Sequence, residues 1–130
     1  MRVQEWIDAY ATAWRTKDPD AAAALFTERG RYQDDPFGTA HVGHAAIRAY
    51  WVDACSTQDA VVTRLGDPII ETGNDRAAVE FWVTNLDSGK ESTLTGILFL
   101  RFSVDGLCEE LRETWISTAG HLEPSANWGK

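Results

Sequence analysis

Three turn-forming dipeptides divide the second half of this 130-residue chain, and they limit its possible folds more than any other feature. Gly73-Asn74, Ser88-Gly89 and Asp105-Gly106 lie 15 and 17 residues apart, each between β-branched and aromatic residues. Such pairs form the tight turns of antiparallel hairpins, because Gly and Asn adopt positive φ at little cost. The spacing predicts a meander of four long strands. Gly66-Asp67-Pro68 interrupts the first strand and predicts a bulge or sharp bend there.

The pairing register follows if the later two dipeptides are two-residue turns. Phe81 then faces Gly96 across the first hairpin, and Gly96 faces Trp115 across the second. In the same register Leu98 faces Glu113. Side chains alternate between the two faces of a sheet. One face is therefore predicted to carry Val79, Phe81, Val83, Leu94, Gly96, Leu98, Leu100, Leu111, Glu113 and Trp115.

The opposite face of the same strands is mixed in character. Trp82, Ile97, Phe99 and Ile116 lie at its centre, among threonines and charged residues. That composition is typical of a protein–protein interface, so we expect a homodimer formed through this face. The alternative is that part of the helical layer covers it.

The first half of the chain predicts three helices. Apolar residues recur at helical spacing from Val3 to Trp14, which indicates an amphipathic helix of about 13 residues. Asp18-Pro19-Asp20 starts a second helix that we expect to end near Gly30. A short strand over 32–34 and a turn over 35–38 then precede a third helix from His44. The chain is expected to be one α+β domain over 1–130, with 120–130 an irregular tail that Trp128 could anchor.

The charge and the cysteines narrow the choice of partners and location. A net charge of −8, with a pI near 4.7 and no basic cluster, disfavours binding to nucleic acid or to an anionic membrane. Cys55 and Cys108 lack the spacing of metal ligands and are expected to be buried free thiols. With no leader and no long apolar run, the expected location is cytoplasmic.

Carboxylates are the candidates for chemistry that the sequence offers. Asp34 and Asp35 follow the predicted first strand, where either could act as a general base, although one could simply cap the turn. Glu113 is the one charged residue on the apolar sheet face, so burial would favour its neutral form. The alternatives are an error in strand parity or an ion pair with a residue such as Arg64.

The order of these segments resembles the nuclear transport factor 2-like superfamily, and in particular its SnoaL-like and ketosteroid-isomerase-like branches. The resemblance rests on DPDAAAALF, RYQDDPFG, GHAAIRAYW and LRETW, and it covers nearly the whole chain. It implies a cone-shaped α+β barrel of the cystatin-like roll type. Three N-terminal helices pack on a strongly curved, mostly antiparallel sheet in such a fold, and its mouth lies near the short first strand.

The resemblance also suggests roles for single residues. The isomerase base falls on Asp35 if the Asp-Pro pair is held fixed, and on Asp34 if the match is ungapped; the parity shared with Tyr32 favours Asp34. Tyr10 matches the oxyanion-hole tyrosine, whereas Leu98 stands where that enzyme has its second, acidic donor. His41 matches the use of His with Asp in SnoaL-like cyclases.

A pocket lined by aromatic residues follows from the cone and from the six Trp, five Phe and three Tyr of the chain. Any of these side chains could instead be plain core. The residues expected in its wall are Trp14, Phe37, Trp51, Phe81, Leu94, Gly96, Leu98, Leu111 and Trp115.

The predicted function is acid–base chemistry on a small apolar metabolite, of the isomerase, cyclase or dehydratase type, without metal or cofactor. Asp34 or Asp35 would be the base, Tyr10 a hydrogen-bond donor and Glu113 a second acid. The alternative is a ligand-binding or dimerisation module without catalysis. A cavity of about 300 Å³ or more with a buried acid would favour the enzyme.

Overall fold

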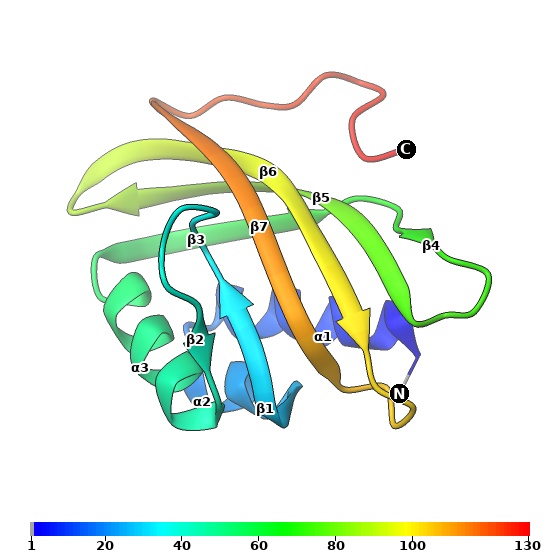
Figure 1. Ribbon diagram of the computed structural model, residues 1–130. Coiled ribbons are helices and arrows are strands. Elements are labelled where there is room, and N and C mark those ends of the chain that lie inside the picture. The colour runs from blue at the N-terminus through cyan, green and yellow to red at the C-terminus, as the bar shows by residue number, and fades with distance from the viewer. Residues whose placement is uncertain (1) are drawn as a thin grey trace.

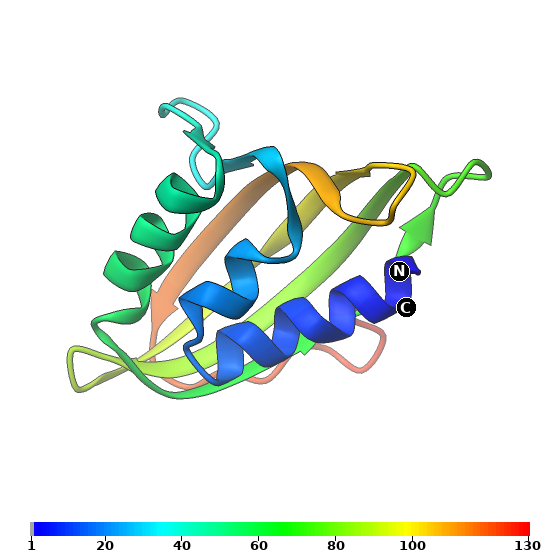
Figure 2. The same ribbon diagram turned by 90° about the horizontal axis from the view of Figure 1, so that it is seen from below.

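The computed structural model describes residues 2–130, in which three helices lie across one face of a curved seven-stranded sheet (Figures 1 and 2). The helices are α1 (Val3–Arg15), α2 (Pro19–Ala23) and α3 (His44–Cys55). The strands are β1 (Phe26–Gln33), β2 (His41–Val42), β3 (Gln58–Leu65), β4 (Ile69–Ile70), β5 (Arg76–Asp87), β6 (Lys90–Phe102) and β7 (Cys108–Ala119). None of the helices in this described part is long and apolar enough to span a bilayer.

The strand order in the sheet is β2-β1-β7-β6-β5-β3, with β4 pairing separately with β5. β1 and β7 run parallel, and the other pairs among the described strands are antiparallel. The sheet curls around the helices and stays open, with β2 and β3 at its two edges. This confirms the expected α+β fold of helices on a curved, mostly antiparallel sheet, as an open roll rather than a closed barrel.

The hairpin register is the predicted one. Phe81 pairs with Gly96, Gly96 with Trp115, and Leu98 with Glu113. Gly96 lies over the Phe81 ring: a Cβ added there would stand 2.9 Å from Phe81 Cζ and 1.9 Å from the carbonyl oxygen of Thr114. Only glycine fits this point of the sheet. The predicted break is also present, because β3 ends at Leu65 and pairing resumes in β4 at Ile69.

The first strand corrects the sequence prediction. Helix α2 ends at Ala23, and β1 extends from Phe26 to Gln33, where a helix ending near Gly30 and a strand over 32–34 had been expected. The register between β1 and β7 shifts between Phe26 and Arg31, so this stretch bulges. Burial of Phe26 and Tyr32 against the helices, together with pairing to a strand far along the chain, outweighs the local helix preference.

The amphipathic stripe of α1 forms the centre of the core. Trp6 stacks on Tyr10 with ring centroids 5.2 Å apart, and its Nε1 donates to the carbonyl oxygen of Leu25 at 2.8 Å. Both side chains are fully buried. Cys55 and Cys108 are buried free thiols, as predicted.

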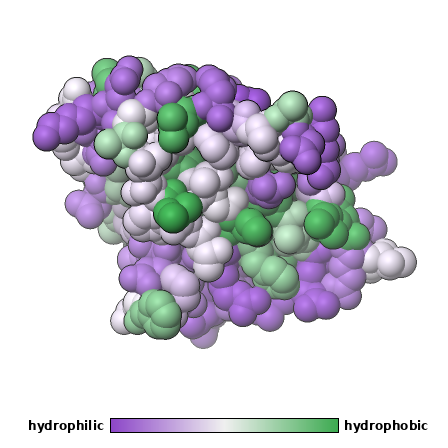
Figure 3. All heavy atoms as spheres, turned by 90° about the horizontal axis from the view of Figure 1, so that it is seen from above, coloured by the Kyte–Doolittle hydropathy of each residue, from purple (hydrophilic) through white to green (hydrophobic). Residues whose placement is uncertain are grey.

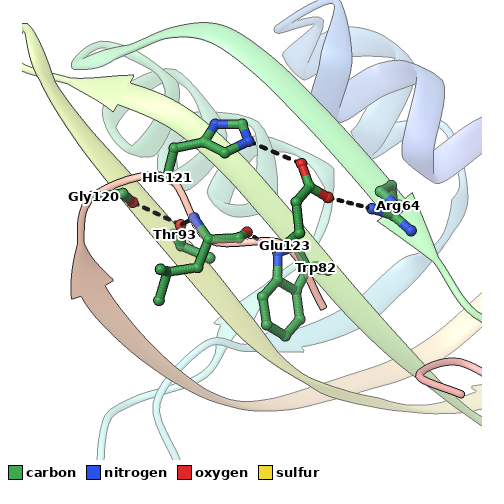
Figure 4. Close-up of polar contacts among 7 residues, drawn as sticks. Arg64, Trp82, Thr93, Gly120, His121 and Glu123 are labelled. Carbon is green, nitrogen blue, oxygen red and sulfur yellow. Dashed lines mark hydrogen bonds and ion pairs between the residues drawn. The ribbon is translucent and has the colours of Figure 1, made fainter. Parts of the chain in front are cut away.

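The C-terminal tail, 120–130, runs back over the outer face of the sheet (Figure 1, red). Trp82 Nε1 donates to the carbonyl oxygen of Leu122 at 2.9 Å (Figure 4). The hydroxyl of Thr93 donates to the carbonyl oxygen of Gly120 at 2.7 Å. Glu123 accepts from Arg64 at 3.0 Å and lies 2.9 Å from His121 Nε2.

Trp128 anchors the end of the tail. Its ring meets Trp82 edge to face at 6.0 Å, and the guanidinium of Arg64 lies 5.8 Å from its centroid. The amide of Asp67 also donates to the carbonyl oxygen of Gly129 at 2.6 Å. The tail thus covers the Trp82 side of the outer face, whereas apolar side chains remain exposed elsewhere on that face (Figure 3). Ile97 and Ile116, which point to the outer face, are exposed.

Candidate active site

A pocket of about 230 Å³ lies between α1, α3 and the inner face of β5, β6 and β7. Pairing of β1 with β7 ends at Arg112, so β7 has a free edge from Glu113 onward. The pocket reaches solvent beside this edge, where Trp115 and Ser117 are exposed. It is lined by Tyr10, Trp14, Tyr32, Tyr50, Trp51, Ala54, Cys55, Gln58, Asn85, Asp87, Ser92, Leu94, Glu113, Trp115 and Ser117.

Glu113 is the buried acid of this pocket. Its inward orientation follows from strand alternation between Leu111 and Trp115, and only 6% of its surface is exposed. Burial, and secondly the negative charge of Asp34, raise its pKa to about 8. In the described chain no lysine or arginine forms an ion pair with Glu113, and Arg64 pairs with Glu123 on the outer face. Glu113 is therefore mainly protonated at neutral pH.

Three tyrosines surround this acid. The hydroxyls of Tyr10 and Tyr32 are 2.8 Å apart, and the rings of Tyr32 and Tyr50 lie 5.1 Å apart. Burial, followed by the nearby Glu113, raises the pKa of all three tyrosines. Each hydroxyl therefore keeps its proton. Within the Tyr10–Tyr32 pair one hydroxyl donates to the other, which leaves the second proton free for another acceptor.

Asp34 stands next to the pocket but does not line it. Its carboxylate lies 3.0 Å from His41 Nε2, and its carbonyl oxygen accepts from Trp115 Nε1 at 2.9 Å. The His41 ring stacks on Tyr50 at 4.6 Å. Hydrogen bonds thus fix both the carboxylate and the backbone of Asp34. Its negative charge adds to the effect of burial in raising the pKa of Glu113 and of Tyr50, although Asp34 itself does not line the pocket.

Asp35 caps the turn, which was the alternative to its predicted role as a general base. Its carboxylate accepts from the amide of Phe37 at 2.9 Å, and its carbonyl oxygen accepts from the amide of Gly38 at 3.0 Å. The prediction that Phe37 lines the pocket is wrong: its side chain is 97% exposed, because the turn projects away from the strand end. Of the two aspartates, only Asp34 lies near Glu113.

Four other predicted wall residues belong to the core or the sheet backbone instead. Phe81, Leu98 and Leu111 are fully buried, and Gly96 stands over Phe81 without reaching the pocket. Phe81 packs against Trp14 at 5.7 Å, so the tryptophan shields it from the pocket. The predicted residues that do line the pocket are Tyr10, Trp14, Trp51, Leu94, Glu113 and Trp115.

Several polar residues of the wall were missed. Asn85 and Asp87 continue the inward alternation of β5, as Ser92 does on β6 and Ser117 on β7. The same parity that located Glu113 could have found them. The pocket was expected to be apolar. Instead it is aromatic along its length, with polar side chains at either end.

The charges in the wall have one sign. Among the described residues, no lysine, arginine or histidine lines the pocket, whereas Glu113 and Asp87 do. Such a wall offers no cationic partner to a carboxylate or phosphate. Within residues 2–130, no set of three or more His, Cys, Asp or Glu side chains is placed to hold a metal ion.

Comparisons with known proteins agree on one fold. The SnoaL-like domain family matches residues 7–111. SalBIII, an epoxide hydrolase/cyclase-like enzyme with a role in pyran ring formation in the polyether salinomycin, superposes with a TM-score of 0.79 at 17% identity, over 90% of this chain and 95% of its own. No curated protein sequence matches significantly.

Two further structures share this architecture. A protein with a ketosteroid isomerase-like fold from Catenulispora acidiphila, in complex with trimethylamine, has a TM-score of 0.76 at 18% identity, over 88% of this chain and 86% of its own. A candidate polyketide cyclase from Sinorhizobium meliloti has a TM-score of 0.66 at 24% identity, over 85% and 94%. At these identities the likeness establishes the fold.

Proposed function

Because the chain belongs to the SnoaL-like domain family, we propose that it is an enzyme that transfers protons on a small carbonyl compound without an anionic group, held in the pocket. The observation that carries this proposal is Glu113, a buried acid in the pocket wall beside tyrosine hydroxyls. The cyclase descriptions of SalBIII and of the Sinorhizobium meliloti protein support a reaction of the isomerising or ring-forming kind.

The residues suggest the following proton transfer. The carbonyl oxygen of the ligand accepts a hydrogen bond from the hydroxyl that the Tyr10–Tyr32 pair leaves free. Glu113, as carboxylate, takes a proton from the neighbouring carbon: the C–H bond breaks, an O–H bond forms on Glu113, and the electron pair becomes an enolate. The tyrosine hydroxyl stabilises the charge on the enolate oxygen. Glu113 then returns the proton to carbon.

The pKa of Glu113 suits it to this task. A carboxylate with a pKa near 8 is a far stronger base than an exposed glutamate, and about one tenth of it is ionised at pH 7. Asp34 contributes from outside the wall by raising this pKa, and His41 and Trp115 fix its position. Asp34 is thus assigned as a positioning residue rather than the base.

The test is exchange of the α-hydrogens of cyclohexanone for deuterium in D₂O, followed by proton NMR. We expect exchange faster than in buffer alone, with a rate that rises with pH up to about 8 as Glu113 ionises. Glu113→Gln should lose about 100-fold or more. Glu91→Gln, a matched change of an exposed glutamate, should leave the rate unchanged. Equal rates in the protein and the Glu113→Gln variant would refute Glu113 as the base.

Pocket size favours a second candidate, a ligand-binding module without catalysis. The 230 Å³ volume falls below the roughly 300 Å³ that would favour the enzyme, and the residue that faces Glu113 is Leu98 rather than a second acid. The trimethylamine complex of the Catenulispora acidiphila protein supports ligand capture in this fold. Tight binding of a small ketone with no α-exchange would favour this candidate.

A further inference from the structure

A second polar group lies at the opposite end of the pocket from Glu113. Asn85 and Asp87 lie on the inner face of β5, where Asn85 pairs with Ser92 and Asp87 pairs with Gln58. All four line the pocket, and they come from three adjacent strands. Trp14 Nε1 donates to Gln58 Oε1 at 3.1 Å, which ties this end to α1.

Asn85 supplies the observation that points to a ligand. More than nine-tenths of its surface is buried, and within residues 2–130 its Oδ1 has no hydrogen-bond partner. A buried acceptor without a partner costs about 1–3 kcal/mol, so native proteins rarely leave one unpaired unless something else supplies the donor.

The electrostatics indicate what kind of group would fit. Asp87 is an exposed carboxylate at the mouth, and no ion pair joins it to Lys90, its cross-strand neighbour, in the described residues. The acceptors here therefore have no cation among the lining residues. A hydroxyl or an ammonium group can donate to them, whereas a carboxylate would meet repulsion from Asp87.

We propose that Asn85 and Asp87 form a recognition subsite for a hydrogen-bond donor, a hydroxyl or a protonated amine, at the end of the ligand remote from its carbonyl group. The position of the carbonyl end rests on the proposed function. The substrate class becomes a small amino- or hydroxy-substituted carbonyl compound without an anionic group.

The size of the pocket agrees with such a ligand. A 150 Å³ apolar cavity holds benzene, so 230 Å³ has room for about nine non-hydrogen atoms.

The experiment compares four ketones of nearly equal size: 4-(aminomethyl)cyclohexanone, 4-(hydroxymethyl)cyclohexanone, 4-ethylcyclohexanone and 4-oxocyclohexanecarboxylate. Binding is followed by the fluorescence of the wall tryptophans and by calorimetry, in 150 mM salt so that the overall negative charge attracts little. We expect the amine and the alcohol to bind at least tenfold more tightly than the ethyl compound, and the carboxylate to bind most weakly.

Single substitutions separate the contributions of Asn85 and Asp87 to binding. Asn85→Leu should reduce the advantage of the amine and the alcohol over the ethyl compound to about twofold or less. Asp87→Asn should weaken the amine about tenfold and leave the alcohol nearly unchanged. Asp75→Asn, which removes the same charge from an exposed turn far from the pocket, is the control and should change neither.

Each outcome bears on one proposal. Equal binding of amine and carboxylate, or an unchanged order of affinities in both variants, would overturn the subsite. If Asn85→Leu does not fold, the exposed Asp87→Asn change still decides the matter. Selective binding of the amine without α-exchange would support the subsite and contradict the proposed enzyme, whereas exchange without selectivity would do the reverse.

Discussion

The two faces of β5, β6 and β7 have similar sequences and opposite surroundings. Both carry tryptophan and large aliphatic residues, yet on the inner face Phe81 and Leu98 are fully buried, whereas on the outer face Ile97 and Ile116 are exposed. The N-terminal helices cover the inner face, and of the described residues only the tail covers part of the outer one (Figures 1 and 2). The face that becomes core is therefore decided by segments elsewhere in the chain.

Polar groups are used differently on the two faces as well. On the outer face they pair with one another or with the tail, as Arg64 does with Glu123. On the inner face Glu113 has no cation to pair with, and Asn85 Oδ1 has no partner in the described chain. Unpaired polar groups in a buried layer reduce stability, which is the pattern expected where a ligand completes the pairing.

The largest effect on the free energy of unfolding is expected at Gly96, where the strands and the Phe81 ring pack most closely. A methyl group at Gly96 would collide with the Thr114 carbonyl and the Phe81 ring, so Gly96→Ala should force the strands apart. We expect a loss of about 4 kcal/mol in the free energy of unfolding, or failure to fold. Urea denaturation measures it.

Gly38→Ala is the matched control. Its added Cβ would lie at ordinary contact distance, 3.4 Å, from the Asp35 Cβ in an exposed turn. We expect a change below about 0.5 kcal/mol. If Gly96→Ala is tolerated equally well, close packing between the strands and the Phe81 ring does not hold the sheet.

The next largest effect is expected from the burial of Glu113, which reduces the free energy of unfolding when the pH rises. The pKa of Glu113 is about 8 when folded against a usual 4.5, so above pH 4.5 the unfolded chain loses a proton that the folded protein keeps. The stability of the native protein therefore falls as pH rises from about 4.5 to about 8. At pH 7 the loss is about 3 kcal/mol relative to pH 4.

Glu113→Gln should remove this loss. Relative to the unmodified protein, the variant should gain about 3 kcal/mol between pH 4 and pH 7, measured by denaturation at each pH. Glu91→Gln at the exposed hairpin should show no such gain. Parallel pH profiles for Glu113→Gln and the unmodified protein would contradict a protonated Glu113.

The smallest effect on folding is expected on the outer face. The homodimer through Trp82, Ile97, Phe99 and Ile116 stays a prediction, and the tail already covers Trp82. Ile97→Lys combined with Ile116→Lys should change the free energy of unfolding of one subunit by less than about 1 kcal/mol, because both side chains are exposed. Sedimentation should show a shift from dimer to monomer. An unmodified protein that sediments as a monomer contradicts the dimer.

Much of the fold could be predicted because its signals are local. Ser88-Gly89 and Asp105-Gly106 set the turns, and alternation then placed Glu113 opposite Leu98 on the inner face. The extent of β1 could not be predicted in this way. Its partner is β7, and no pattern within 24–33 reveals a bulged strand held by a distant neighbour.

The site was predicted less completely for a related reason. Register identifies which residues point inward but not which of them the helices cover. Phe81 was placed in the wall although Trp14 packs over it, and Leu111 was placed there although it is fully buried in the core. Asn85 and Asp87 were missed because the ends of a hairpin resemble solvent-exposed turn residues. Phe37 was misplaced because an aromatic ring in a turn carries no signal of direction.

The parallel pairing of β1 with β7 also sets an order of events during synthesis. Phe26 pairs with Cys108, so the first strand must wait for the last one to emerge from the ribosome. The hairpins of β5, β6 and β7 can form among themselves, whereas Tyr32 and Asp34 meet Glu113 only after this closure. The pocket is therefore complete only after β7 has been made, and a nascent chain stalled before Cys108 would lack Glu113 and the part of the wall that β7 supplies.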